Sequence, residues 1–295
     1  MTLHVLGSVN IDHVYRVPHA PGPGETLADQ GYARGLGGKG ANQALAAARA
    51  GAAVRFVGAI GADGGWTRHH LASTGVAVDH LAQVSEATGH AVILVEPCGE
   101  NRIIIHGGAN RALPASLIDA ALSAARPGDW WLSQNETTRV HESFVAARAA
   151  GLRTAYAAAP FDAAAAEAVL DGLDLLALNE GEAAALETHL GQPLAALPVT
   201  HVLLTLGAQG ARLISGAPGA RTVLEVPAFP VTPIDTTGAG DCFLGVALAG
   251  LDHGLEAAEA LRRAAAAAAI QVTRPGAAGA LPDVTEIDAF LAERA

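Results

Sequence analysis

The chain has 295 residues, of which 51% are hydrophobic and 16% charged, and its formal net charge is -11. This content excludes a disordered chain, and the acidic balance argues against an electrostatic surface for nucleic acid or membrane. The two cysteines, Cys98 and Cys242, are too few for a disulfide scaffold. Because the sequence also has no signal peptide and no apolar run of about 20 residues, we expect a cytoplasmic protein with small-molecule partners.

Short β-rich runs alternate with Ala-rich segments along most of the chain. This alternation is typical of parallel strands joined by crossover helices, so we predict one α/β domain over residues 1–295, with a central, mostly parallel sheet between helix layers. The predicted strands are Leu3 to Gly7, Val54 to Ile60, Asp129 to Leu132, Arg153 to Ala157, Leu173 to Leu178 and His201 to Thr205. Three helices are predicted to end near the cap glycines Gly51, Gly75 and Gly151.

Two stretches interrupt the alternation, at about 13–36 and 88–106. The first is rich in Pro and Gly, and the second resembles a hairpin around residues 97–101. We expect them to pair as a small β-sheet outside the main core.

The first glycine-rich loop, Gly35 to Gly40, has the spacing of a dinucleotide-binding fingerprint. Its context is wrong, because about thirty residues separate it from the first predicted strand, whereas the fingerprint follows that strand directly. It is not a Walker A loop either, since Ala33 stands at the first Gly position and Gly40 replaces the Ser or Thr after Lys39. The loop therefore argues against a dehydrogenase, and Lys39 needs another ligand.

The second glycine-rich loop runs from Asp235 to Asp241 and leads into an apolar helical stretch. Backbone N–H groups at Gly238, Ala239 and Gly240 would converge at a helix N-terminus, which favours an anion such as a transferring phosphoryl group. Asp241 in this place is either a helix cap or a general base that accepts a proton from an attacking hydroxyl. The surrounding glycines favour the general base.

Together these motifs resemble the ribokinase-like, or PfkB, carbohydrate kinases over essentially the whole chain. The resemblance rests on Gly7 to Asp12, Pro23 to Thr26, Gly37 to Gln43, Gly107 to Asn110, Asn179 to Glu182, Thr205 to Gly210 and Asp235 to Asp241. It implies a three-layer α/β fold with a β-sheet lid, formed by the stretches at about 13–36 and 88–106. It also implies transfer of the γ-phosphate of ATP to a sugar hydroxyl, with D-ribose as the expected sugar. Asp241 would be the base, and the sugar contacts would come from Asn10, Asp12, Gly38, Lys39, Asn42, Glu136 and Asp241.

The resemblance also implies the cofactors and the quaternary structure. ATP would be bound by Asn179, Thr205, Gly207 and Gly210, and Mg²⁺ would be held indirectly by Glu182. A monovalent cation, K⁺, would lie near Asp235, Thr237, Arg274 and Gly276. Enzymes of this family pair the lids of two subunits, which predicts a homodimer, and the alternative is a monomer whose lid folds back.

Three departures from the family pattern leave alternatives open. Ala157 and Leu244 stand where Asn is usual, and Ala265 stands where His or Asn often lies against adenine. The alternatives are a related kinase acting on fructose, a deoxy sugar acid or a nucleoside, and a sugar-binding regulator without turnover. A metal site at the adjacent His69 and His70 is disfavoured, because neighbouring residues point to different sides of a helix.

Overall fold

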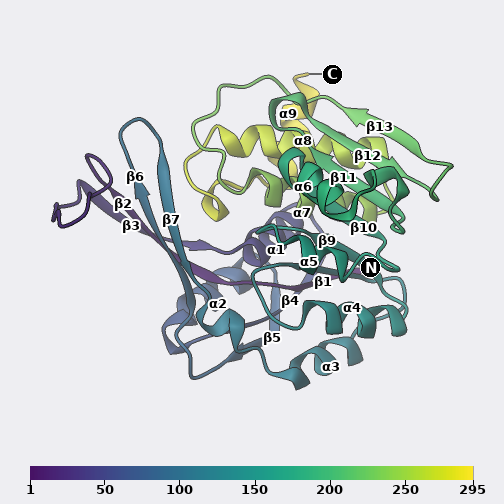
Figure 1. Ribbon diagram of the computed structural model, residues 1–295, viewed down its shortest axis with the longest axis horizontal. Helices are drawn as coiled ribbons and strands as arrows, with labels where there is room; N and C mark the ends of the chain where they lie inside the picture. The colour runs from purple at the N-terminus through teal and green to yellow at the C-terminus, as the bar shows by residue number, and fades with distance from the viewer. Residues whose placement is uncertain (295) are drawn as a thin grey trace.

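The computed structural model describes residues 1–294, which contain two separate sheets (Figure 1). Within this range the larger sheet has nine strands in the order β13-β12-β11-β10-β9-β8-β1-β4-β5. Neighbouring strands are parallel except at the two antiparallel pairs β11–β12 and β12–β13. The bounds are β1 Thr2–Leu6, β4 Ala53–Ile60, β5 Ala77–Gln83, β8 Trp130–Gln134, β9 Arg153–Ala157, β10 Leu175–Asn179, β11 His201–Thr205, β12 Ala211–Ser215 and β13 Thr222–Val226.

Helices cover both faces of this sheet, and a separate apolar cluster fills each interface. One face carries α1 (Lys39–Arg49), α2 (Gly65–Ser73), α7 (Ala239–Asp252), α8 (Ala257–Val272) and α9 (Val284–Ala292). The other carries α3 (Ala115–Ser123), α4 (Val140–Ala149), α5 (Ala163–Glu167) and α6 (Glu180–Leu190). Trp130 and Trp131 belong to opposite clusters, because successive side chains of a strand point to opposite faces.

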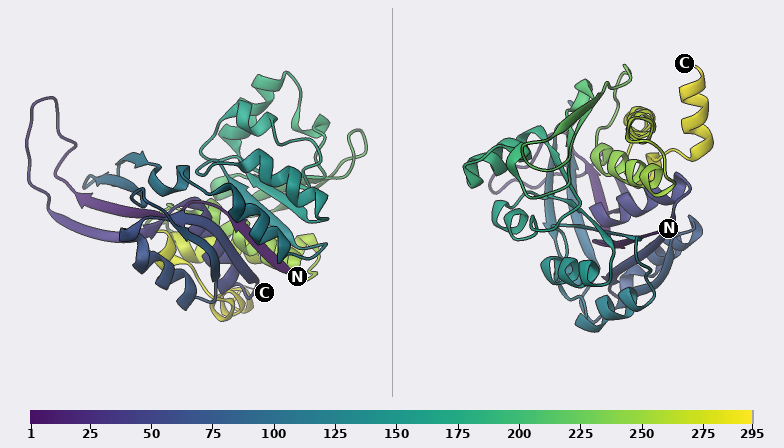
Figure 2. Two further views of the ribbon diagram at one scale, coloured as in Figure 1. Left: turned by 90° about the horizontal axis from the view of Figure 1, so that it is seen from below. Right: turned by 90° about the vertical axis from the view of Figure 1, so that its right-hand side faces the viewer.

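The second sheet, hereafter the lid sheet, projects from the main body (Figures 1 and 2). Its strands are β2 (Asn10–Arg16), β3 (Gly31–Gly37), β6 (Gly89–Val95) and β7 (Asn101–His106), in the order β3-β2-β6-β7. The predicted hairpin is present: β6 and β7 are antiparallel, and the Glu96 N–H donates to the Glu100 carbonyl (2.9 Å) in the turn between them.

The predicted fold class is confirmed by this arrangement of a mostly parallel sheet between helix layers with a small additional sheet. The cap glycines Gly51, Gly75 and Gly151 have φ of 94°, 90° and 77°, the left-handed conformation that a glycine adopts without strain. The lid sheet begins earlier than expected, at Asn10, because β2 follows β1 after only three residues.

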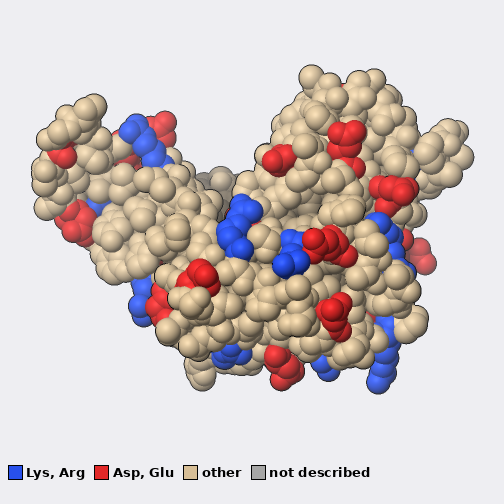
Figure 3. All heavy atoms as spheres, turned by 60° about the horizontal axis from the view of Figure 1, so that its bottom comes forward, with Lys and Arg blue, Asp and Glu red and all other residues tan. Residues whose placement is uncertain are grey.

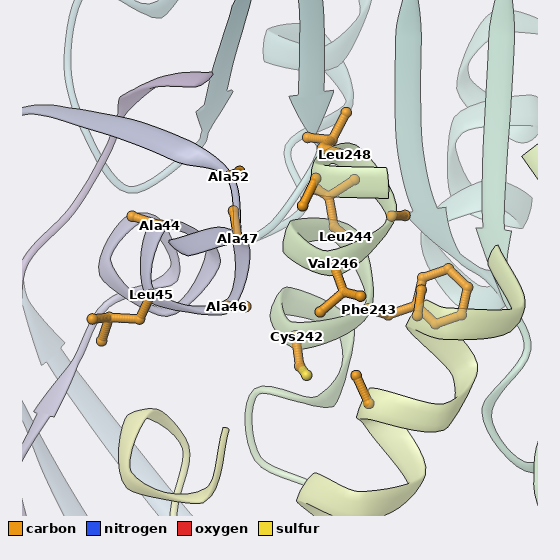
Figure 4. Close-up of a cluster of buried hydrophobic side chains, with 14 of the residues drawn as sticks. Ala44, Leu45, Ala46, Ala47, Ala52, Cys242, Phe243, Leu244, Val246 and Leu248 are labelled. Carbon is orange, nitrogen blue, oxygen red and sulfur yellow. The ribbon is translucent and has the colours of Figure 1, made fainter. Parts of the chain in front are cut away.

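Helices α1 and α7 lie side by side and pack through small residues. Figure 4 shows Ala46 and Ala47 of α1 next to the ribbon of α7. A Cβ atom at Gly245 of α7 would lie 2.6 Å from the Gln43 carbonyl oxygen and 2.7 Å from the Ala46 Cβ, so only glycine permits this approach. The close contact brings the N-terminal turns of both helices to the same end of the sheet.

No helix within residues 1–294 combines the length and apolar character needed to cross a membrane. On the face drawn in Figure 3, basic side chains are interspersed with acidic ones and form no continuous basic surface. That distribution agrees with the acidic net charge.

Candidate active site

The carboxylate of Asp241 lies in the first turn of α7 and is 8% exposed. Its two oxygens accept hydrogen bonds from amide side chains of α1: Oδ1 from Gln43 Nε2 (2.8 Å) and Oδ2 from Asn42 Nδ2 (3.2 Å). Burial raises the pKa of Asp241, and the positive charge of Lys39 and the two amide donors oppose this effect. A carboxylate with a raised pKa and a charged neighbour is suited to accept a proton.

The loop before Asp241 leaves backbone donors free at the start of α7. Gly238 has φ 75°, which turns the chain into the helix, and the Ala239 N–H donates back to the Thr236 carbonyl (3.2 Å). The next two amides, of Gly240 and Asp241, belong to the first helical turn, whose N–H groups have no acceptor within the helix. No atom lies within 4 Å of a Cβ built on Gly240, so this helix end is open to an anion.

The loop that contains Lys39 is held against the end of β1. Gly38 has φ 94°, and a Cβ atom there would lie 2.8 Å from the Ser8 carbonyl oxygen, so the turn requires glycine. The Lys39 N–H donates to Glu136 Oε2 (3.0 Å), which also accepts from the Ser8 hydroxyl (2.5 Å). Glu136 therefore fixes the start of α1.

A cavity of about 210 Å³ lies beside Glu136. Its lining residues are Asn10, Ile105, Gly107, Asn110, Arg111, Asn135, Glu136 and Pro160. The Asn110 side chain donates to Asn10 Oδ1 (2.8 Å) and accepts from the Val9 N–H (2.9 Å), which fixes both amides at the cavity wall. Fixed amide and carboxylate groups on the wall of a small cavity suit a polyhydroxylated ligand.

Asp12 lies on β2, two residues after Asn10, and a Cβ atom built on Gly37 would fall only 2.1 Å from its Oδ2. It belongs to neither cavity lining. Burial, together with the like charge of Glu136, raises the pKa of Asp12 to about 7. Two carboxylates that repel each other are costly to keep together without a ligand, and residues of this kind concentrate at functional sites.

A second cavity of about 270 Å³ opens at the carboxyl ends of β10 and β11, in front of α7. The predicted residues on its lining are Lys39, Asn179, Glu182, Thr205, Gly238, Ala239, Gly240 and Asp241. Asn179 and Glu182 form a reciprocal capping box at the start of α6, with both hydrogen bonds at 2.8 Å. Burial raises the pKa of Glu182, and Asp241 adds to this effect.

Asp235 joins the Asp235–Asp241 loop to the segment after α8. Its Oδ1 accepts from the Thr237 N–H (2.9 Å) and its Oδ2 from the Gly276 N–H (2.8 Å). Although burial alone would raise the pKa of Asp235, these hydrogen bonds outweigh it and lower the pKa. The Arg274 guanidinium donates to Glu286 (2.5 Å) and not to Asp235.

Comparison with known proteins gives the family. The model of the pfkB family carbohydrate kinases matches residues 2–284. The chain belongs to this family. It is 37% identical to a ribokinase of Haemophilus influenzae, over 98% of both chains. Among solved structures, ribokinase of Cryptococcus neoformans in complex with ADP has a TM-score of 0.86 and 35% identity, covering 100% of this chain and 99% of its own. Ribokinase of Arabidopsis thaliana complexed with ribose and ATP has a TM-score of 0.84 and 28% identity, covering 98% of each.

The kinase brings most of the predicted site residues together. Asn10 and Glu136 line the smaller cavity, Lys39 and Asp241 line the larger one, and Asn42 is bonded to Asp241. Asn42 Oδ1 is buried without a partner among the described residues, which leaves an acceptor beside Asp241.

Two predicted nucleotide-binding glycines lie outside both cavity linings. The linings include neither Gly207, the first residue of the 3₁₀ turn Gly207–Gln209 after β11, nor Gly210, which follows that turn. A Cβ atom at Gly210 would lie 2.1 Å from the Val226 carbonyl oxygen. Close backbone packing therefore requires glycine at position 210, independently of nucleotide binding. The unusual Ala157 and Leu244 line the larger cavity, and Ala265 is buried on α8.

Two further residues at the site carried no assigned role in the sequence analysis. Asn110 connects Asn10 to Val9, in the short segment between β1 and β2, and the Gly107–Asn110 motif was the signal for it. Gln134 is fully buried at the carboxyl end of β8 and donates to Gln43 Oε1 (2.6 Å). The sequence signal for Gln134 was weaker, because it is only a polar residue just after a predicted buried strand, two positions before Glu136.

Proposed function

We propose that this kinase is a ribokinase that transfers the γ-phosphoryl group of ATP to a hydroxyl of D-ribose, giving ribose 5-phosphate and ADP. One placement carries the assignment: the buried Asp241 carboxylate lies directly beside the open N-terminus of α7, where a base and an anion site are adjacent. The identity to ribokinases over almost the full chain supports ribose as the sugar.

In the proposed reaction, ribose occupies the smaller cavity, with its hydroxyls bonded to Asn10, Asp12 and Glu136. Asp241 accepts the proton of the attacking hydroxyl as that oxygen bonds to phosphorus. The amides at the start of α7 and the ammonium group of Lys39 stabilise the charge on the transferring group. The nucleotide extends through the larger cavity along Asn179 and Thr205 toward Gly207 and Gly210.

Two cations complete the proposal. Glu182 lines the larger cavity, and its carboxylate fits Mg²⁺, directly or through water, because this ion prefers oxygen ligands. When bound, Mg²⁺ neutralises charge on the nucleotide phosphates. The Asp235 carboxylate and the carbonyls of the loops that it joins are also oxygen donors, which fit K⁺, and Asp235 and Thr237 precede the amides of the anion site directly.

The proposal extends to the assembly and its location. The edge strand β7 exposes Ile103, Ile104 and Ile105 at 48%, 70% and 52%, and an apolar open edge of this kind requires a covering partner. We infer a homodimer formed through the lid sheets. A cytoplasmic location fits the use of ATP and the two unpaired cysteines, the exposed Cys98 and the buried Cys242.

A coupled assay of ADP release across a panel of acceptors tests the function. The panel contains ribose, fructose, a deoxy sugar acid and a nucleoside, each with Mg²⁺-ATP. The expected result is the highest kcat/KM with ribose. A higher value with another acceptor would replace ribose by that substrate, and binding of sugar without ADP release would favour the sugar-binding regulator.

A further inference from the structure

A row of buried polar side chains leads from the centre of the main sheet to Asp241. Gln134 Nε2 donates to Gln43 Oε1 (2.6 Å), and Gln43 Nε2 donates to Asp241 Oδ1 (2.8 Å). Gln134 is 0% exposed and Gln43 2% exposed. The two glutamines come from different elements, β8 and α1, and the proposed reaction gives neither of them a role.

The direction of the row is determined at Asp241. The ionised carboxylate can only accept hydrogen bonds, so Gln43 presents its amide NH₂ group to it and directs its oxygen toward Gln134. Gln134 Nε2 donates to that oxygen, whereas Gln134 Oε1 is buried without a partner among the described residues. The reverse orientation of the Gln43 amide would place its oxygen against the Asp241 carboxylate, and two acceptors that face each other in a buried site are costly. Asp241 therefore selects the orientation of Gln43, and the hydrogen bond from Gln134 stabilises that orientation.

Glycines hold the row in place by allowing close backbone contacts. Gly245 lets α7 approach the Gln43 backbone, as described above. Gly7, after β1, leaves room for the Gln134 amide, because a Cβ atom there would lie 2.6 Å from Gln134 Oε1. Little space remains for either glutamine to adopt another rotamer, so the donor that reaches Asp241 is preorganised.

We propose that Gln43 and Gln134 are positioning residues for phosphoryl transfer, which hold the Asp241 carboxylate in the orientation in which it accepts the proton of the acceptor hydroxyl. This inference rests on the proposed function, in which Asp241 is the base. The amide donor also favours the ionised carboxylate: the hydrogen bond from Gln43 lowers the pKa of Asp241 and so opposes the effect of burial. Without it, more of Asp241 would be protonated at a given pH and unable to accept a proton.

A purely structural role would be a buried amide pair that stabilises the fold and nothing more. Replacement of each glutamine by methionine, which is similar in length and has no amide, separates the two roles. Gln43→Met removes the donor to Asp241. Gln134→Met removes the hydrogen bond that holds the Gln43 oxygen, and the double variant removes the row. For each, kcat, KM for ribose, the pH profile of kcat and the melting temperature are measured with ADP release as the activity readout.

We expect Gln43→Met to lower kcat about 10- to 100-fold, the usual effect of losing a group that orients a reactive residue, with KM for ribose changed less than about threefold. The acid limb of its pH profile should move to higher pH. Gln134→Met should do the same to a smaller extent, and the double variant should lose less than the product of the two single effects, because both act through one carboxylate.

Ser143→Ala is the matched control, because Ser143 accepts a buried hydrogen bond from Trp131 Nε1 (3.0 Å) outside the site. It should lower the melting temperature and leave the acid limb unchanged. An acid limb that stays in place in Gln43→Met, or single effects that multiply in the double variant, would overturn the positioning role. Asp241→Asn is measured in parallel. If this variant keeps activity, the assignment of Asp241 as the base is wrong. If it loses activity but the glutamine variants behave like Ser143→Ala, the base stands and only the positioning role fails.

Discussion

Asp241 is a buried carboxylate held by two amide donors, and its isosteric replacement tests it as the base. Asn at this position keeps the shape of the side chain but cannot accept the hydroxyl proton. We expect Asp241→Asn to lower kcat by about 10²- to 10⁴-fold, the usual contribution of a positioned general base, with KM for ribose changed only a few-fold. Steady-state kinetics with ribose and ATP measure both constants.

A second buried aspartate on the same helix provides the control. Asp252 at the end of α7 is 6% exposed and pairs with Arg153 (3.8 Å), at the amino-terminal end of the sheet. Asp252→Asn should lower the melting temperature and leave kcat near the wild-type value. Near wild-type turnover in Asp241→Asn would show that Asp241 is not the base.

Asp12 should make ribose binding depend on pH near neutrality. Because burial and the charge of Glu136 raise its pKa to about 7, Asp12 is largely protonated below that pH and loses its charge-assisted hydrogen bonds to the sugar. We expect KM for ribose to rise about fivefold as pH falls through 7, as a difference of about 1 kcal/mol implies. The KM of Asp12→Asn should be high and independent of pH in this range.

The same shift predicts the opposite trend for stability without ligand. Between the unperturbed pKa of 3.8 and the folded-state value of about 7, the folded protein binds the Asp12 proton more tightly than the unfolded chain does. The contribution of Asp12 to the free energy of unfolding therefore falls as pH rises through this interval. At pH 8, Asp12→Asn should melt at a higher temperature than the wild type. A lower melting temperature at pH 8 would contradict the raised pKa.

At the scale of elements, the two loops that Asp235 joins connect the proposed K⁺ site to the anion site. K⁺ should raise kcat by ordering the amides at the start of α7, and Na⁺ should serve less well. Asp235→Asn would place an NH₂ group against the N–H of Thr237 or of Gly276 and so separate the loops. We expect this variant to lose on the order of tenfold in kcat and most of the K⁺ activation. Titration of K⁺ at constant ionic strength, with tetramethylammonium as the balancing cation, measures this, and equal rates in both cations would reject the site.

The elements differed in how far the sequence alone predicted them. The bounds of β9 and β11 were predicted correctly, because a short apolar run between helical segments specifies a buried parallel strand locally. The early start of the lid sheet at Asn10 was missed, since β2 pairs with β6, almost eighty residues later, and nothing local reports that pairing. The antiparallel strands β12 and β13 were also not predicted.

The site residues also differed in how far the sequence alone predicted them. Asp241 and its glycines were found from sequence because their chemistry depends on neighbouring residues in one loop. Gln134 was not, because its partner Gln43 lies 91 positions away, and a glutamine at a strand end has no motif of its own. The raised pKa of Asp12 was likewise out of reach, because it depends on burial and on the charge of Glu136, and only the folded chain provides both.

At the scale of the whole molecule, the lid sheet predicts the oligomeric state. Both of its edges, β3 and β7, are open, and all six residues of β7 are exposed. Ile105 lines the smaller cavity, so Ile104, whose side chain points to the opposite face of the strand, faces away from the site. A lid with one face over the sugar and the exposed Ile104 on the other face is suited to pairing with a second lid by a two-fold axis.

We therefore expect sedimentation at micromolar concentration to give twice the 29.7 kDa of one chain, and Ile104→Lys to give a single chain, because it places a charge in the apolar contact. Val223→Lys is the matched control: Val223 is 58% exposed on β13, the edge strand of the main sheet far from the lid, so this variant should stay dimeric. The side chain at position 104 points away from the sugar cavity, so any rise in KM for ribose in Ile104→Lys should result from loss of the partner lid. This rise in KM should be largest at the protein concentrations where the measured mass is lowest. A wild-type mass of one chain that is unchanged by ribose and nucleotide would rule out the dimer and favour a lid that closes on its own domain.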